Sequence, residues 1–302
     1  MSFWERLRKF IRFPGISHKN LGPDNTEKPN EVCEGDNRCD FAGAVSSDVG
    51  CVRSNNEDNY ILGNYMNANS ADHSEAALSL TISPVTWKFA GVFDGMGGGE
   101  VGEIASRDTA SIFLNAINRL VSNPSKNEID ICLRQAFLDA NNKIVDLQQE
   151  YKIFGTTGTV LCTNGSEFKV YHLGDSRAYL VRECEFLQLT KDQTLAQMKI
   201  DVGMYTEDDP AAEADKHKLT EYIGRDWTRE NIKPVESHWI PVSSGDLILL
   251  CSDGLYDMCT NEEISAILTD EGSIEHKVGH LVSKACSNGG EDNITCVLIS
   301  FV

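Results

Sequence analysis

Acidic residues at the ends of apolar, strand-like segments constrain this sequence more than any other feature. Asp94, for example, follows the apolar run 87–93, and Asp253 follows the run 246–252. Side chains at strand ends converge on one mouth of a sheet, and clusters of oxygen ligands suit hard divalent cations such as Mg²⁺ or Mn²⁺. The pattern therefore predicts a metal centre and a hydrolase. The acidic residues are Glu57, Asp58, Asp94, Asp253 and Asp292.

The charge of the chain is its one unusual bulk property. Its 302 residues are 41% hydrophobic and 24% charged, which is ordinary for a soluble protein, but the net charge is −19. An even acidic surface and carboxylates gathered around cations both explain this value. Under either explanation the chain is a poor candidate for binding nucleic acid, because it would repel the phosphates.

The cysteines point to free thiols in a reducing cytosol. Cys162, Cys251 and Cys296 lie inside apolar strand-like runs, and no Cys-x-x-Cys pair occurs among the ten cysteines. Cys33 and Cys39 form the one loose pair.

The first 40 residues differ from the rest. Residues 1–13 form a basic amphipathic segment, which we expect either to dock on this protein or a partner or to lie on an anionic membrane surface. Residues 14–40 are polar and rich in turn formers, as in a flexible linker. No run approaches the ~20 apolar residues needed to span a bilayer. The expected location is the cytoplasm, with peripheral binding at the inner face of the membrane left open.

The folded body is expected to span residues 41–302. Its strands and helices come in blocks, which favours an α+β domain with antiparallel sheets. Residues 63–84 are predicted to form a surface loop, and residues 191–235 an irregular or mobile acidic insertion. Strands are predicted at 41–47, 59–62, 87–93, 159–163, 168–173, 178–181, 246–252 and 293–301, and helices at about 101–120, 129–147, 261–269 and 275–287.

Seven short motifs appear in an order that resembles a known family. They lie at 48–58, 92–98, 155–158, 172–177, 189–192, 252–257 and 292–295. Together they resemble the metal-dependent protein phosphatases of the PPM (type 2C) family, and Met96 after Asp94-Gly95 resembles the bacterial branch. The resemblance implies a four-layer α-β-β-α sandwich of two antiparallel sheets flanked by helix pairs. It also implies hydrolysis of phosphoserine and phosphothreonine in proteins, by in-line attack of a water that bridges two divalent metals.

The resemblance assigns metal-binding roles residue by residue. Asp94 is expected to bridge the two Mg²⁺ or Mn²⁺ ions, and the Gly95 carbonyl to add a ligand. Asp253 and Asp292 would complete one ion, and Glu57 would serve the other, mostly through waters.

Further residues have looser assignments. Asp58 is expected to reach metal-bound waters or to ligate directly. Arg53 is the expected substrate clamp, because a planar guanidinium grips phosphate with two donors. The resemblance leaves open a third ion near Asp175, Asp253 and Asp257.

Two features concern activity and access. Many eukaryotic relatives carry His where this chain has Met96, and a thioether cannot protonate a leaving alkoxide, so another group must do so. The insertion at about 193–235 occupies the position of the family's flap beside the cleft, where its acidity would disfavour acidic phosphopeptides.

The expected partners are phosphorylated proteins, and the expected state is a monomer. The alternative is a pseudo-phosphatase that binds phosphoproteins with little or no turnover.

Overall fold

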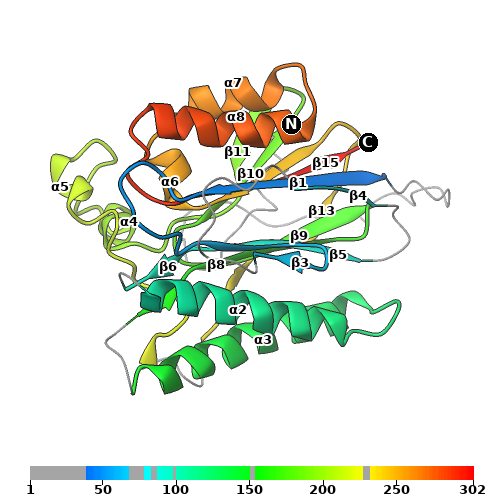
Figure 1. Cartoon of the computed structure of the whole chain (residues 1–302), viewed down its shortest axis with the longest axis horizontal. Helices are drawn as coiled ribbons and strands as arrows, with labels where there is room; N and C mark the ends of the chain where they lie inside the picture. The colour runs from blue at the N-terminus through cyan, green and yellow to red at the C-terminus, as the bar shows by residue number, and fades with distance from the viewer. Residues whose placement is uncertain (1–38, 68–77, 83–86, 98–99, 150–153, 227–231) are drawn as a thin grey trace, which may run out of the picture.

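Two antiparallel sheets lie face to face, and a pair of helices covers the outer face of each sheet (Figure 1). The structure is a computed structural model that describes residues 39–67, 78–82, 87–97, 100–149, 154–226 and 232–302. The predictions for residues 1–13 and for the linker up to residue 38 lie outside these ranges. The order of layers confirms the predicted α+β sandwich.

Sheet A is built around its first and last strands in sequence. β1 and β15 pair along their whole length, with Phe41 opposite Phe301 and Asp48 opposite Ile294. The strand order is β11-β10-β14-β15-β1-β4. The strands are β1 (Phe41–Asp48), β4 (Leu78–Ile82), β10 (Arg177–Arg182), β11 (Glu185–Gln188), β14 (Leu247–Cys251) and β15 (Ile294–Phe301).

Sheet B has the order β12-β9-β8-β5-β2-β3, and β13 pairs with β9. The turn between β8 and β9 contains Asn164 and Gly165. Gly165 has a φ of 81°, a backbone angle that residues other than glycine rarely adopt. Asn-Gly is typical of tight hairpin turns, and β8 and β9 indeed pair antiparallel on either side of it. The strands are β2 (Asn59–Leu62), β3 (Tyr65–Met66), β5 (Lys88–Phe93), β8 (Gly158–Thr163), β9 (Glu167–Leu173), β12 (Val235–Glu236) and β13 (Ile240–Pro241).

Four long helices bury apolar faces against the sheets. α2 (Glu100–Asn118) and α3 (Lys126–Leu147) pack on sheet B, while α7 (Asn261–Thr269) and α8 (Ile274–Ser287) pack on sheet A (Figure 1). Phe137 of α3 is fully buried among the residues of this layer. A third apolar cluster fills the space between the sheets. The sandwich therefore has three cores, and its strand ends are held firmly enough to position polar groups.

Two predictions about irregular segments are wrong. The segment 63–84, predicted to be a loop, contains β3 and also β4, which pairs with β1. The insertion contains two short helices, α4 (Leu195–Asp201) and α5 (Pro210–Glu213), instead of irregular chain alone. The start of the insertion is tied to its middle, because the Leu195 N–H donates to the Lys218 carbonyl at 2.8 Å.

The cysteines of the described residues are all free thiols, which confirms that prediction. Cys162, Cys251 and Cys296 are buried, as expected. Cys33, one member of the loose pair, lies outside the described residues. None of the helices in the described ranges is long and apolar enough to cross a membrane.

Candidate metal centre and active site

A cavity of about 430 Å³ opens at one end of the sandwich, where the loops of both sheets meet. Figure 1 shows α4, α5, α6 and β6 gathered at this end. β6 (Gly95–Met96), β7 (Gly155–Thr156) and α6 (Asp253–Tyr256) are short elements that follow or flank the long strands. Eight predicted site residues line the cavity: Arg53, Glu57, Asp94, Gly95, Asp175, Asp253, Asp257 and Asp292.

The backbone of Asp94 is fixed by the neighbouring strand pair. Its N–H donates to Thr157 Oγ1 at 2.9 Å, and its carbonyl accepts from Thr156 Oγ1 and from the Thr157 N–H, both at 2.8 Å. These bonds hold the residue where β5 ends. No side chain of the described residues donates a hydrogen bond to the Asp94 carboxylate, so it faces the cavity without a protein partner.

Gly95 must be glycine because two backbone segments touch it. A Cβ at this position would lie 2.3 Å from the Gly102 carbonyl oxygen and 2.5 Å from that of Glu57. Gly102, in the first turn of α2, is equally close to the site, since its own Cβ would lie 1.8 Å from Glu57 Oε2. The missing side chains let the helix, the Asp94 loop and Glu57 come together.

Asn293 ties the Glu57 loop to the Asp292 loop. Its Oδ1 accepts from the Glu57 N–H at 2.8 Å, and its Nδ2 donates to the carbonyls of Val49 and Asn55 at 2.9 and 3.0 Å. Asn293 is 4% exposed, so these bonds are protected from water. Residues 236 positions apart in sequence thus lie side by side. We did not single out Asn293 from the sequence, although it stands inside a recognised motif.

Arg53 forms an ion pair with a predicted metal ligand. Its Nη2 lies 2.6 Å from Asp292 Oδ2, and the Arg53 side chain is 48% exposed. Partial burial acts to lower the pKa of Arg53, but the nearby carboxylates of Asp292, Glu57 and Asp253 outweigh it and raise this pKa. Because Arg53 lines the cavity, its guanidinium stands at the rim of the carboxylate group.

Asp58 is not brought to the cavity. It is 3% exposed, and its Oδ2 accepts a hydrogen bond from Ser252 Oγ at 2.7 Å. Burial is the largest cause that raises the pKa of Asp58, to about 7, while the hydrogen bonds from Ser252 and Thr295 act in the opposite direction. Since Ser252 precedes Asp253, the hydrogen bond between Ser252 and Asp58 helps to hold the Asp253 loop in place from outside the cavity. Direct ligation by Asp58 stays a prediction.

The carboxylates in the cavity repel one another. Burial, followed by the charge of Asp253, raises the pKa of Asp94 and of Asp175 well above the usual range. The same two causes raise the pKa of Asp257 and of Asp292 less strongly. No ion pair within the described part of the chain involves Asp94 or Asp175. Such a group ionises fully at neutral pH when cations offset its charge.

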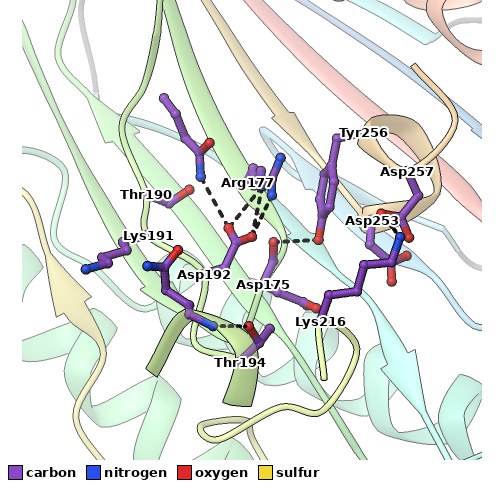
Figure 2. Close-up of polar contacts among 12 residues, drawn as sticks. Asp175, Arg177, Thr190, Lys191, Asp192, Thr194, Lys216, Asp253, Tyr256 and Asp257 are labelled. Carbon is purple, nitrogen blue, oxygen red and sulfur yellow. Dashed lines mark hydrogen bonds and ion pairs between the residues drawn. The ribbon is translucent and has the colours of Figure 1, made fainter. Parts of the chain in front are cut away.

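Arg177 organises the side of the cavity that carries Asp175 (Figure 2). Its Nε and Nη2 donate to the two carboxylate oxygens of Asp192 at 2.9 and 2.6 Å, and its guanidinium stacks on the Tyr256 ring at 3.6 Å. The Tyr256 hydroxyl in turn donates to the Asp175 carbonyl at 3.2 Å. A bidentate pair of this kind is directional, so it fixes the strand end beside the cavity.

The insertion contributes a lysine and a histidine that were not singled out from the sequence. Lys216 Nζ lies 3.4 Å from Asp257 Oδ1, and His217 lies 3.6 Å from both Asp253 Oδ2 and Asp257 Oδ2. Many acids of the insertion do not face the cavity. Asp215, for example, is 6% exposed, and hydrogen bonds from two lysines of the insertion lower its pKa to about 2. The composition of this segment is therefore a poor guide to the charge it presents to a substrate.

Comparison with known proteins assigns the family. Residues 46–199 match the family model described as protein phosphatase 2C. The chain belongs to the protein phosphatase 2C family. It is 31% identical over 211 residues to the serine/threonine phosphatase stp of Listeria welshimeri, a match that covers 69% of this chain and 82% of that protein. It is 32% identical over 259 residues to the protein phosphatase PhpP of Streptococcus pneumoniae, covering 85% and 96% of the two chains.

Solved structures of phosphatases support the same assignment. The serine/threonine phosphatase of S. agalactiae matches with a TM-score of 0.74 and 28% identity, over 86% of this chain and 99% of that one. The catalytic domain of the phosphatase PstP in complex with 2 manganese ions matches with a TM-score of 0.67 and 28% identity, over 87% and 99%. These matches confirm the bacterial type of the protein phosphatase 2C chain and its enzyme class of protein serine/threonine phosphatase.

Proposed function

We propose that this protein phosphatase 2C chain hydrolyses phosphoserine and phosphothreonine in proteins with two divalent ions held at the end of the sandwich. Asp94 would bridge the ions, with Gly95, Asp253 and Asp292 as further ligands and Glu57 contacting through waters. Asp58 would contact metal-bound waters or bind an ion directly. The ions are proposed to be Mg²⁺ or Mn²⁺, because every one of these donors is an oxygen.

One observation supports the proposal above all others. Asp94 and Asp175 point their carboxylates into one cavity, their pKa values are raised by burial and mutual repulsion, and no described cation pairs with either of them. Burying carboxylates without partners costs several kcal/mol per charge, and a structure tolerates them where bound ions complete the site. The donor set therefore fits divalent cations.

The ions and the protein would divide the chemistry between them. Bound divalent cations would supply positive charge to the phosphoryl oxygens and activate a water molecule as the nucleophile. The backbone bonds at Asp94 and the contacts of Asn293 hold the ligand loops in place before substrate arrives. Preorganised groups of this kind lower the barrier because they need not reorient during the reaction.

Arg53 is proposed to bind the substrate phosphate. It uses one nitrogen for Asp292, and its other N–H groups make no hydrogen bond to a described residue. These donors are aimed from the rim of the cavity and suit two phosphate oxygens. Arg53 would thus position the phosphoryl group beside the carboxylates.

Hydrolysis of a phosphothreonine peptide tests the proposal. Turnover is expected with Mn²⁺ or Mg²⁺ and none with excess chelator. Asp94→Asn should lower kcat by about a thousandfold or more, since several kcal/mol of charge stabilisation are lost. Equal turnover with and without chelator would refute the metal-dependent mechanism. Phosphopeptide binding without turnover under any of these conditions would favour the pseudo-phosphatase alternative.

The role of Arg53 has its own test. Arg53→Ala should raise KM more than it lowers kcat, because the interaction serves mainly to capture substrate. Arg53→Lys is the matched control, which keeps the charge and removes the two-donor fork. An unchanged KM in Arg53→Ala would exclude the clamp.

We further propose that the chain acts as a cytoplasmic monomer on phosphorylated proteins, and that residues 41–302 form the phosphatase domain. Buried free thiols are typical of proteins in a reducing compartment. Peripheral contact through residues 1–13, with a membrane or a partner, is a separate proposal. Deleting residues 1–38 and comparing turnover and vesicle binding would test both assignments.

A further inference from the structure

His217 lies where a metal ligand would lie, although it belongs to the insertion and not to any motif of the family. Within the described residues, His217, Asp253 and Asp257 are the one group of His, Cys, Asp and Glu side chains whose ligand atoms all lie within 4.8 Å of one another. Asp175, near which the resemblance leaves open a third ion, lines the same cavity but is not part of this close group.

We infer that His217 is a nitrogen ligand of a further divalent ion, which it binds together with Asp253 and Asp257. This inference rests on the proposed function, because it adds an ion to the same cavity. It changes the ligand set expected from the sequence by adding an imidazole to an oxygen-only group.

The backbone around His217 is held in place. The Leu195 N–H donates to the Lys218 carbonyl, and the Thr220 N–H donates to the Gln193 carbonyl, both at 2.8 Å. Residues 216–220 are therefore clamped to the first residues of the insertion. His217 approaches α6 from this hydrogen-bonded segment, so little conformational entropy of the chain need be lost when His217 binds an ion.

The side chains around His217 suit a cation. Its nitrogens lie 3.6 Å from the carboxylate oxygens of Asp253 and of Asp257, and it is 54% exposed, so an ion can enter from the cavity. Asp175 is only 5% exposed, and no described cation forms an ion pair with its carboxylate, so it offers a further carboxylate beside the group once a cation is bound. His217 is the one imidazole among the described residues that line the cavity.

An imidazole alters which ion is preferred. Carboxylates and waters suit Mg²⁺ and Mn²⁺, whereas imidazole binds better to the transition metals along the series from Mn²⁺ to Zn²⁺. The third site should therefore prefer Mn²⁺ or a later transition ion over Mg²⁺. Binding would also connect the insertion to α6 through the ion, so occupancy and the position of the flap would depend on each other.

Lys216 supplies a matched control at the next position. Its ammonium lies 3.4 Å from Asp257 Oδ1 and carries charge but cannot act as a ligand while protonated. Lys216→Met removes a cation that competes for Asp257, so it should leave Mn²⁺ affinity unchanged or increase it. His217→Ala removes a ligand, so it should weaken Mn²⁺ binding.

The test is Mn²⁺ binding to the full-length protein by equilibrium dialysis, together with pulsed electron paramagnetic resonance. His217→Ala should need about 10- to 100-fold more Mn²⁺ to fill the further site, at least the loss seen for residues that only orient a ligand. The wild-type spectrum should contain modulation from an imidazole nitrogen that disappears in His217→Ala. His217→Asp should restore binding without that modulation and shift the preference towards Mg²⁺.

Three results would overturn the inference. They are equal Mn²⁺ binding by wild type and His217→Ala, nitrogen modulation that persists in His217→Ala, and a loss of affinity in Lys216→Met as large as in His217→Ala. Asp94→Asn keeps the two hypotheses separate. Full turnover in Asp94→Asn would refute the proposed function, whereas metal-dependent wild-type turnover with no effect of His217→Ala on Mn²⁺ binding would refute only the role of His217.

Discussion

The buried carboxyl of Asp58 makes the metal-free enzyme sensitive to pH in a direction that can be calculated. Its pKa is raised from 3.8 to about 7, with burial as the largest cause. Between these values the folded protein holds a proton that the unfolded chain has released, so the free energy of unfolding falls as pH rises. The loss is about 1.4 kcal/mol per pH unit, or about 4 kcal/mol in all, and it levels off above about pH 7.

Asp58→Asn should therefore stabilise the metal-free protein. The amide keeps the shape of the side chain and an oxygen that can accept the hydrogen bond from Ser252 Oγ. The gain should be about 4 kcal/mol at pH 8, about 3 kcal/mol at pH 6, and close to zero near pH 4. Part of this gain comes from relief of the repulsion between Asp58 and Asp94.

Urea unfolding with excess chelator, for wild type and Asp58→Asn at several pH values, measures this gain. A gain that does not depend on pH, or a loss of stability at pH 8, would show that the pKa of Asp58 is not raised in the native state and would refute the reasoning. Repeating the experiment with Mn²⁺ tests the predicted ligand role. If Asp58 binds an ion or its waters, the variant should gain less stability from Mn²⁺ than wild type does.

Three further predictions use other parts of the structure. Gly95→Ala should destabilise the protein by about 2 kcal/mol or more and weaken Mn²⁺ binding, because the added Cβ would overlap backbone atoms. Gly279→Ala is the control, since this glycine lies in open space on α8 and the change should stabilise the protein by about 0.5–1 kcal/mol. Urea unfolding of the two variants compares these free energies. Phe137→Ala should cost about 3–5 kcal/mol because the ring is fully buried, seen as a lower midpoint of thermal unfolding without a change in metal preference. In the native protein a thiol reagent should modify exposed Cys184 rapidly and leave Cys251 intact, since burial raises the pKa of Cys251 to about 12; rapid loss of Cys251 would contradict its burial.

Site residues next to long apolar strands were predictable from the sequence. Asp94 and Asp253 stand at the ends of β5 and β14, where periodicity is strong and the following chain must turn, so their convergence on one cavity could be expected. His217 could not be found in this way. It lies in a segment with weak apolar periodicity, and its approach to α6 depends on backbone bonds between residues far apart in sequence.

Errors in the secondary structure have physical causes as well. β4 was missed because polar residues surround it, although its sequence Leu-Ser-Leu-Thr-Ile alternates as an edge strand should. The helices of the insertion are short, and side-chain bonds at Thr194 and Asp209 cap their first turns, which hydrophobic periodicity does not reveal.

The two sheets contribute opposite walls of the cavity, with Asp94 after a strand of sheet B and Asp253 and Asp292 beside strands of sheet A. An ion shared by these walls would cross-link two layers that otherwise pack mainly through apolar side chains. Removal of the cations should then weaken the contact between the two sheets at this end of the sandwich first, before either pair of helices loses its packing on a sheet. Hydrogen exchange in the metal-free protein would show that opening as lost protection at the ends of β5 and β14, while protection at α3 persists.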